Sequence, residues 1–297
     1  MSTPRPAPKP DKSDSATIAA VLRSAAARLS ELNDTARLDT EILLALALNR
    51  DRSHLRAWPE RELLPEEQER FRDLIEQRRS GTPIAYLSGE KEFWSRAFKV
   101  RPDVLIPRPE TELLIELALA FIPATQMADI LDLGTGSGAI AVTVAAERPL
   151  ARITATDLST GALEVAQENA GLHGVRNIRF QLGDWFNAVQ DDERFDLIVS
   201  NPPYVADDDP HLSQGDVRFE PALALKGGIH GLDAFRIIAR EARDYLKPHG
   251  RLMLEHGFDQ AKSLADLLTE FGYTDISHHL DLQGYARVTT ARSGKRV

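Results

Sequence analysis

From residue 128 onward, short apolar runs alternate with longer runs whose apolar residues recur at helical spacing. Such periodicities distinguish buried strands from amphipathic helices. The expected strands cover residues 128–134, 151–157, 176–182, 195–201, 251–257, 273–280 and 284–291, and the expected helices cover residues 139–146, 160–171, 231–246 and 258–271. Strands that alternate with helices predict an α/β fold, here a mostly parallel seven-stranded sheet with helices on both faces.

The chain before residue 128 has a different character. Apolar residues three and four apart predict a first helix, with Asp14 or Ser15 as its N-cap: Ile18, Val21, Leu22, Ala25 and Leu29. Further helices are expected at about 36–49, from Pro65 to Ser80, and at 110–121. Residues 82–107 are typical of a short hairpin or extended linker. We therefore expect a disordered tail (1–14), a small helical bundle (15–88), a linker (89–107) and the α/β domain (108–297).

Charge and composition exclude several classes of protein. The 297 residues carry 36 basic and 45 acidic side chains, a net charge of −9. Residues 1–90 contain 14 basic and 15 acidic side chains, whereas residues 91–297 contain 22 and 30. An acidic α/β domain argues against broad binding to nucleic acid, which needs a positive surface.

The chain contains no cysteine, which excludes a disulfide scaffold, a thiolate metal site and a cysteine nucleophile. The eight histidines lack a paired metal-binding spacing, so we expect no metal. Apolar stretches fall short of the roughly 20 residues of a membrane span, and residues 1–14 lack an export signal. We expect a cytoplasmic protein without a membrane partner, and nothing indicates an obligate oligomer, so we expect a monomer.

A glycine-rich loop follows the first expected strand of the α/β domain. Asp132 leads into it, and its residues are Gly134, Thr135, Gly136, Ser137 and Gly138. Glycines at a strand-to-helix turn let a ligand approach the backbone, and Asp157, at the end of the next strand, suits two ribose hydroxyls. The loop holds no lysine, unlike a P-loop. Together these residues predict an adenosine-containing cofactor; the alternative is a tight turn that only connects strand and helix.

The third expected strand also ends in an acid, Asp184, which is followed by Trp185. This position suits a carboxylate that faces an adenine amino group beside a stacking ring. The alternative is a solvated loop acid next to a core aromatic.

The most specific motif is Asn201-Pro202-Pro203-Tyr204, which follows the strand 195–201. Ligands of open α/β sheets bind at the carboxyl ends of strands. Proline stiffens the backbone without adding a donor, so a carbonyl and the Asn201 side chain can accept both hydrogens of a planar NH₂ group. Tyr204 offers a ring face as a wall.

Such a pair of acceptors suits methyl transfer to an amide or an exocyclic amine. The nitrogen lone pair of these groups is delocalised, so the nitrogen is a poor nucleophile. Acceptors stabilise the positive charge that develops on it, and alignment with a sulfonium methyl contributes by proximity. The motif therefore predicts an amino-methylating enzyme; a proline-stiffened turn is the alternative.

At this point the chain resembles the S-adenosylmethionine-dependent methyltransferases, which have a Rossmann-like fold. Over residues 15–290 it is similar to the HemK/PrmC family, the peptide chain release factor glutamine methyltransferases. The matching stretches are ARLDTEILL (36–44), KEFWSRAF (91–98), LIPRPETE (105–112), LDLGTGSGAIA (131–141), GDWF (183–186), SNPPY (200–204), PHLSQGDVRFEPALAL (210–225) and LEHG (254–257).

The resemblance implies methylation of the N5 amide nitrogen of glutamine in the Gly-Gly-Gln motif of class 1 release factors, with the helical domain gripping the factor. Gly134–Gly138, Asp157, Asp184, Trp185 and Asn201 would then bind S-adenosylmethionine. The substrate glutamine would be held by the Asn-Pro-Pro-Tyr residues, with Phe93, Arg108 and Glu110 nearby, and Asn201, Pro202 and Tyr204 would serve catalysis. Two alternatives stay open: methylation of adenine N6 in DNA or RNA, and methylation of a ribosomal-protein glutamine.

Overall fold

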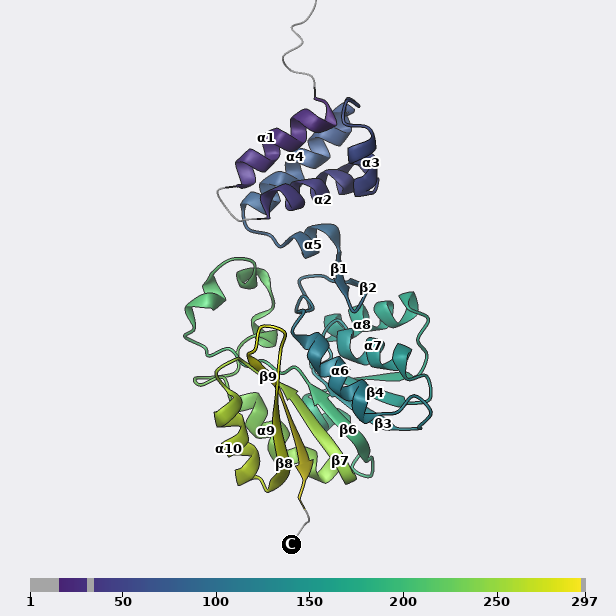
Figure 1. Ribbon diagram of the computed structural model, residues 1–297, viewed down its shortest axis with the longest axis vertical. Coiled ribbons are helices and arrows are strands. Elements are labelled where there is room, and N and C mark those ends of the chain that lie inside the picture. The colour runs from purple at the N-terminus through teal and green to yellow at the C-terminus, as the bar shows by residue number, and fades with distance from the viewer. Residues whose placement is uncertain (1–15, 31–34, 295–297) are drawn as a thin grey trace, which may run out of the picture. The chain divides into compact units, whose positions relative to one another are not determined.

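The computed structural model describes residues 16–30 and 35–294, and the chain divides into two compact units, residues 1–88 and 89–297 (Figure 1). The expected disordered tail, residues 1–14, lies outside the described residues. Each unit contains a hydrophobic core of its own.

The first unit is a helical bundle, as predicted. Its helices are α1 (Ile18–Leu29), α2 (Ala36–Leu48), α3 (Arg52–Ala57), α4 (Pro65–Arg79) and α5 (Ile84–Ser88). The short helices α3 and α5 were not expected. The N-cap of α1 is Thr17, whose Oγ1 accepts a hydrogen bond from the amide of Ala20. The expectation of Asp14 or Ser15, both outside the described residues, is therefore wrong.

A buried ion pair joins α2 and α4 in this unit. Arg78 Nε donates to Asp39 Oδ2 at 2.9 Å, and both side chains are less than a tenth exposed. Arg78 also donates to the carbonyl of Thr82, and Thr35 donates to the other carboxylate oxygen of Asp39. The pair is thus hydrogen-bonded on both sides, which offsets the cost of removing its charges from water.

The second unit begins with a hairpin and continues as the expected α/β domain. The hairpin strands are β1 (Glu90–Phe93) and β2 (Arg96–Lys99). The remaining helices are α6 (Thr111–Phe121), α7 (Ala139–Glu147), α8 (Thr160–Leu172), α9 (Asp233–Tyr245) and α10 (Ala261–Glu270). The strands of the main sheet are β3 (Asp129–Leu133), β4 (Arg152–Asp157), β5 (Ile178–Leu182), β6 (Phe195–Ser200), β7 (Leu246–Glu255), β8 (Tyr273–Leu280) and β9 (Ala286–Ser293).

The main sheet has seven strands in the order β5-β4-β3-β6-β7-β9-β8. Neighbours from β5 to β7 pair in parallel, and β9 runs antiparallel between β7 and β8. The fold-class prediction is therefore confirmed.

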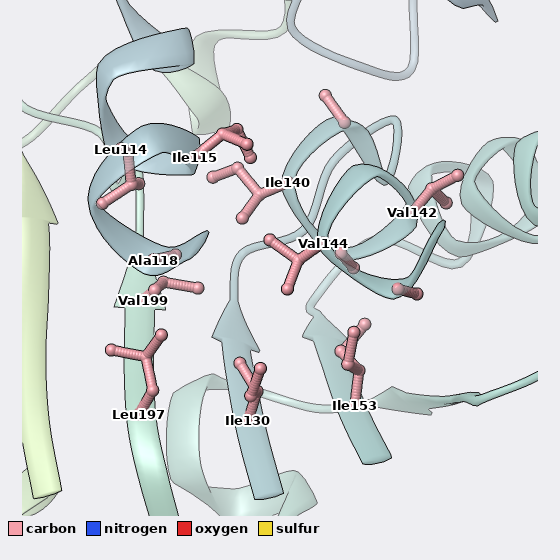
Figure 2. Packing of buried hydrophobic residues seen from close by; sticks show 14 of the residues in the cluster. Leu114, Ile115, Ala118, Ile130, Ile140, Val142, Val144, Ile153, Leu197 and Val199 are labelled. Atoms are coloured by element: carbon pink, nitrogen blue, oxygen red, sulfur yellow. The ribbon is translucent and has the colours of Figure 1, made fainter. Parts of the chain in front are cut away.

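Helices cover both faces of the sheet in this unit, as Figure 1 shows. Alternate residues of one strand point to opposite faces. Accordingly Ile130 packs in the core beneath α6 and α7, whereas Leu131 packs in the core beneath α9 and α10. Figure 2 labels the side chains that meet in the first of these cores: Leu114, Ile115, Ala118, Ile130, Ile140, Val142, Val144, Ile153, Leu197 and Val199.

The strand order reverses between β3 and β6. The candidate site lies at the carboxyl ends of these two strands. In the sheet register Leu133 lies opposite Ser200. The next residues along the two strands are Gly134 and Asn201. Open α/β sheets bind ligands in the crevice at such a reversal. The glycine loop and the Asn-Pro-Pro-Tyr motif therefore begin side by side.

Candidate active site

A cavity of about 490 Å³ opens at the carboxyl ends of β3, β4 and β6. Its volume lies within the range of small-molecule sites. The predicted site residues that line it are Arg108, Gly134, Thr135, Gly136, Ser137, Asp157, Asp184, Trp185, Asn201 and Pro203.

The glycine loop forms the floor of this cavity. Gly134, Gly136 and Gly138 all have positive φ, between 55° and 80°, which L side chains rarely adopt. The amides of Gly134 and Thr135 both donate to the carbonyl of Thr156 on β4. Gly138 does not line the cavity; a Cβ there would lie 3.1 Å from Ala166 Cβ, so this glycine lets α7 and α8 pack closely.

Two carboxyls hold the loop, the buried Asp132 and the half-buried Asp157. Asp132 Oδ2 accepts from Thr135 Oγ1 at 2.7 Å and from the amide of Ala141, and burial raises the pKa of Asp132 to about 7. Asp157 accepts from the amides of Gly136 and Ser159, and burial raises its pKa too. Asp157 lines the cavity whereas Asp132 does not, so only Asp157 is placed to meet a ligand.

Trp185 forms another wall. A Cβ on Gly134 would lie 3.7 Å from Trp185 Cζ3, so the indole lies against the glycine loop. Trp185 itself has a φ of 46°, an uncommon conformation for a bulky residue. The neighbouring Asp184 is exposed and lines the same cavity. An acid and an aromatic ring thus face the cavity together.

Asn201 lies where this cavity meets a smaller one. Its Nδ2 donates to Thr111 Oγ1, the first residue of α6, at 3.2 Å. Among the described residues, none donates a hydrogen bond to Asn201 Oδ1 or to the carbonyl of Pro202. Both oxygens are therefore available as acceptors.

The smaller cavity, of about 160 Å³, shares Leu105, Arg108, Asn201 and Ala224 with the larger one. Its other lining residues are Pro202, Tyr204, Val205, His211, Leu212, Val217 and Leu225. Most of this wall is apolar, so the pocket suits an aliphatic stem that ends in a polar group at Asn201.

Tyr204 is fixed through its backbone. Gln260 Nε2 donates to the carbonyls of both Tyr204 and Gly231, at 3.0 and 3.2 Å. Gln260 Oε1 in turn accepts from the amide of Gly257. Burial raises the pKa of the Tyr204 phenol, and the negative charge of Glu255 acts in the same direction. The phenol therefore stays protonated at neutral pH.

Arg108 is tied to the segment that follows β6. Its Nη2 donates to Glu220 Oε1 at 2.5 Å, and the amide of Ile106 donates to Glu220 Oε2 at 3.0 Å. The Glu220 side chain is fully buried. This bond joins residues 105–109 to residues 217–225, which together wall both cavities.

Two predicted substrate-binding residues line neither cavity. Phe93 is buried in the core and meets Phe98 edge-to-face, with ring centroids 5.8 Å apart. Glu110 precedes α6, and its charge acts on Tyr204 and Glu255.

Several residues that line or support the cavities were not expected from the sequence: Thr111, Glu220, Lys226, Gly227, Gly231, Asp233 and Gln260. They lie far from the two motifs along the chain. A glycine-rich run, 226–231, was visible as Lys-Gly-Gly-Ile-His-Gly and could have indicated close backbone packing. No group of side chains suited to hold a metal ion occurs in the described part of the chain.

The fold and these residues define the class of the protein. Residues 110–222 match the family described as methyltransferase small domain. A methyltransferase from Pyrococcus furiosus has a similar fold, with a TM-score of 0.52 at 19% identity over 75% of this chain and 99% of the other. So does a Thermus thermophilus 16S rRNA methyltransferase, with a TM-score of 0.51 at 18% identity over 69% of this chain and 49% of the other. The second unit is thus a Rossmann-like methyltransferase domain.

The sequence comparisons give the family. Residues 20–89 match the family described as PrmC N-terminal domain. A release factor glutamine methyltransferase of Shewanella oneidensis is 44% identical over 94% of this chain and 97% of its own length. Another, from Pseudomonas aeruginosa, is 48% identical over 88% and 94%. The chain belongs to the family of release factor glutamine methyltransferases, as its resemblance implied.

Within the described residues, none of the helices has both the length and the apolar character needed to cross a bilayer.

Proposed function

We propose that this protein transfers the methyl group of S-adenosylmethionine to the side-chain amide nitrogen of a glutamine in a peptide chain release factor. The specific target would be the glutamine of the Gly-Gly-Gln motif in class 1 factors. The observation that carries the proposal is the position of Asn201, whose free oxygen lies where a larger and a smaller cavity meet.

The larger cavity has the chemistry expected for S-adenosylmethionine. Asp157 would hold the ribose hydroxyls, the loop Gly134–Gly138 would approach the ligand through its backbone, and Asp184 with Trp185 would face the adenine. The lining contains four acids against two basic residues, a balance that favours a ligand with net positive charge: Asp103, Asp157, Asp184 and Asp233 against Arg108 and Lys226. When bound, this cofactor supplies an electrophilic methyl group on a positively charged sulfur.

The smaller cavity would take the glutamine side chain. Its apolar wall would cover the aliphatic stem, and the Asn201 side-chain oxygen and the Pro202 carbonyl would accept the two amide hydrogens. When the nitrogen takes the methyl group, the sulfur–methyl bond would break and leave S-adenosylhomocysteine. The nitrogen gains positive charge in this step, and two fixed acceptors would stabilise that charge until one amide proton leaves to water, giving N5-methylglutamine. A carboxylate offers no hydrogens to these acceptors, so the same pair would reject glutamate.

The Asn-Pro-Pro-Tyr motif also suits an adenine amino group. The choice of a protein glutamine as substrate therefore depends on further evidence. Identity of 42% or more to release factor glutamine methyltransferases over most of the chain favours the protein substrate. The excess of acidic side chains in residues 91–297 disfavours binding of DNA or RNA, because the phosphate backbone of a nucleic acid is also negatively charged.

Mass spectrometry of the Gly-Gly-Gln peptide tests the proposal. We expect purified protein and S-adenosylmethionine to add one methyl group to the glutamine of a release factor, with no product when glutamate replaces it. Asn201→Ala should lower transition-state stabilisation by about 2–4 kcal/mol, as removal of one oriented polar group does in other enzymes. Methylation of duplex DNA but not of the factor would overturn the proposal.

A further inference from the structure

Gln260 stands at the start of α10, three residues after the motif Leu254-Glu255-His256-Gly257. It is the N-cap residue of this helix, a position that favours Ser, Thr, Asp or Asn because their short side chains accept a hydrogen bond from the first turn. Within the described residues, the Gln260 side chain makes no such capping bond. Residues that break a local preference in this way are typical of functional sites.

The side-chain amide of Gln260 is instead used in full by other segments. Its Oε1 accepts from the amide of Gly257 at 2.9 Å, and its Nε2 donates to the carbonyls of Tyr204 and Gly231 at 3.0 and 3.2 Å. An amide nitrogen has two hydrogens, so each carbonyl can take one. The reversed orientation would set Oε1 against two carbonyl oxygens and Nε2 against an N–H group. The three partners therefore fix the orientation of this amide.

The loop that carries Gln260 is fixed in turn. The Gly257 carbonyl accepts from the amide of Gln260 at 3.0 Å and from His256 Nδ1 at 2.8 Å. Burial lowers the pKa of His256, which keeps its ring neutral, so its Nε2 accepts from Thr289 Oγ1 at 2.8 Å. His256 and Thr289 are at most 1% exposed. The Gln260 side chain thus extends from a buried, hydrogen-bonded base.

Tyr204 is the residue of the Asn-Pro-Pro-Tyr motif that the prolines leave unrestricted. Pro202 and Pro203 have a fixed φ, and Asn201 and Pro202 are restricted further because each precedes a proline. Tyr204 is followed by Val205 and has neither restriction. Its side chain nevertheless lines the smaller cavity together with Asn201 and Pro202. A contact from outside the motif must therefore hold Tyr204 in place.

We propose that Gln260 is a positioning residue that completes the Asn-Pro-Pro-Tyr motif by holding the Tyr204 backbone, and so places the Tyr204 ring in the wall of the smaller cavity. The inference rests on the proposed function, because the smaller cavity is where the substrate glutamine would bind.

The second carbonyl that Gln260 binds secures the chain beside the motif. Gly231 ends a segment, 225–231, that pairs with the residues that follow Tyr204. The amide of Val205 donates to the carbonyl of Leu225, and the carbonyl of Val205 accepts from the amide of Gly227. One side chain therefore ties the chain that leaves the motif to the segment that pairs with it.

Gln260→Met keeps the length of the side chain and removes all three hydrogen bonds. We expect kcat/KM for the release factor to fall about 10- to 100-fold, because a displacement of about 1 Å in a site can cost that much. The Kd for S-adenosylmethionine should change less than about threefold, since neither Tyr204 nor Gly231 lines the larger cavity. Gln260→Glu keeps the acceptor for Gly257 but loses both donors, and should lose as much activity.

Asn177→Leu is the matched control. Asn177 is half-buried like Gln260, and its Nδ2 lies 2.9, 3.3 and 3.4 Å from the carbonyl oxygens of Ala151, Arg148 and Ala145. It precedes β5, at the end of the sheet away from the cavities. Its replacement should lower stability but leave kcat/KM within about threefold of the wild type.

Fluorine NMR of the full chain labelled with 3-fluorotyrosine tests the position of the ring directly. The chain has five tyrosines, and Tyr204→Phe assigns the line of Tyr204. Gln260→Met should shift or broaden that line, whereas Asn177→Leu should leave it in place. A contribution of Gln260 to stability alone would not move the line.

An unchanged Tyr204 line in Gln260→Met, or wild-type kcat/KM in either Gln260 variant, would overturn the inference and leave the proposed function standing. Loss of the native circular dichroism spectrum in both variants would assign Gln260 to stability and overturn it as well. If the wild type does not methylate the release factor, the proposed function itself fails, and the fluorine spectrum still decides whether Gln260 holds Tyr204.

Discussion

At the scale of single residues, the site depends on glycines that let other segments reach the Asn-Pro-Pro-Tyr backbone. Gly231 has a φ of 66°, and a Cβ there would lie 2.1 Å from the carbonyl oxygen of Tyr204. The same carbonyl accepts from Gln260, which also binds the carbonyl of Gly231. A side chain at position 231 would therefore push Tyr204 away from the donor that holds it.

Gly231→Ala should destabilise the protein by about 1–3 kcal/mol from overpacking, in addition to the cost of the positive φ. Gly174→Ala is the control, because Gly174 has the same φ of 66° and nothing lies within 4 Å of its Cβ position. Chemical denaturation of both variants measures the difference. If both variants lost the same stability, the Tyr204 backbone would be able to move away from the added methyl group at no energetic cost, and the prediction would be wrong.

Residues within one motif could be predicted from the sequence, whereas partners from distant segments could not. The glycine loop and the Asn201 motif carry their chemistry in consecutive residues, and Asp157 ends the strand that follows the loop. Thr111 accepts a hydrogen bond from Asn201 although the two residues are 90 positions apart in the numbering. Only the packing of α6 against the sheet brings them together.

At the scale of elements, periodicity predicted the long helices and the sheet strands but missed the shortest helices. α3 and α5 have six and five residues, less than two turns, so they present no recurring apolar face. The turn at Trp185–Ala188 escaped prediction for the same reason. β7 begins at Leu246, five residues before its expected start, because Leu246 pairs with Phe195 across an irregularity in the register.

The buried ion pair of Asp39 and Arg78, which joins α2 and α4, offers a direct test at this scale. Arg78→Ala should cost about 3–5 kcal/mol of stability, because it leaves the carboxylate of Asp39 buried with one donor fewer. Arg79→Ala, which removes an exposed pair with Glu76 on the same helix, should cost less than about 1 kcal/mol.

Calorimetry, combined with the double variant Asp39→Ala/Arg78→Ala, measures the coupling between the two side chains. Additive effects of the two single substitutions would contradict the assigned contact.

At the scale of the whole molecule, the chain places its cavities in one unit. Every residue that lines either cavity lies between Pro102 and Ile237, within residues 89–297. That unit also has two core clusters of its own. The first unit has a separate core, and we expect it, from the family resemblance, to grip the release factor.

Residues 89–297 expressed alone should therefore fold and bind S-adenosylmethionine with a Kd within about threefold of the full chain, a difference of less than 1 kcal/mol. Isothermal titration calorimetry of the fragment and the full chain gives both constants. Loss of cofactor binding in a fragment with native circular dichroism would show that residues 1–88 contribute to the cofactor site.

The two hydrogen bonds that Glu220 accepts from Ile106 and Arg108 have a consequence for the order of events during folding. They join residues 112 and 114 positions apart, so the walls of both cavities close only after a long stretch of chain has been ordered. Closing so long a loop carries an entropic cost that local helices and hairpins avoid. Competence to bind ligand therefore arrives late, and a ligand selects fully folded chains over partly folded ones by mass action.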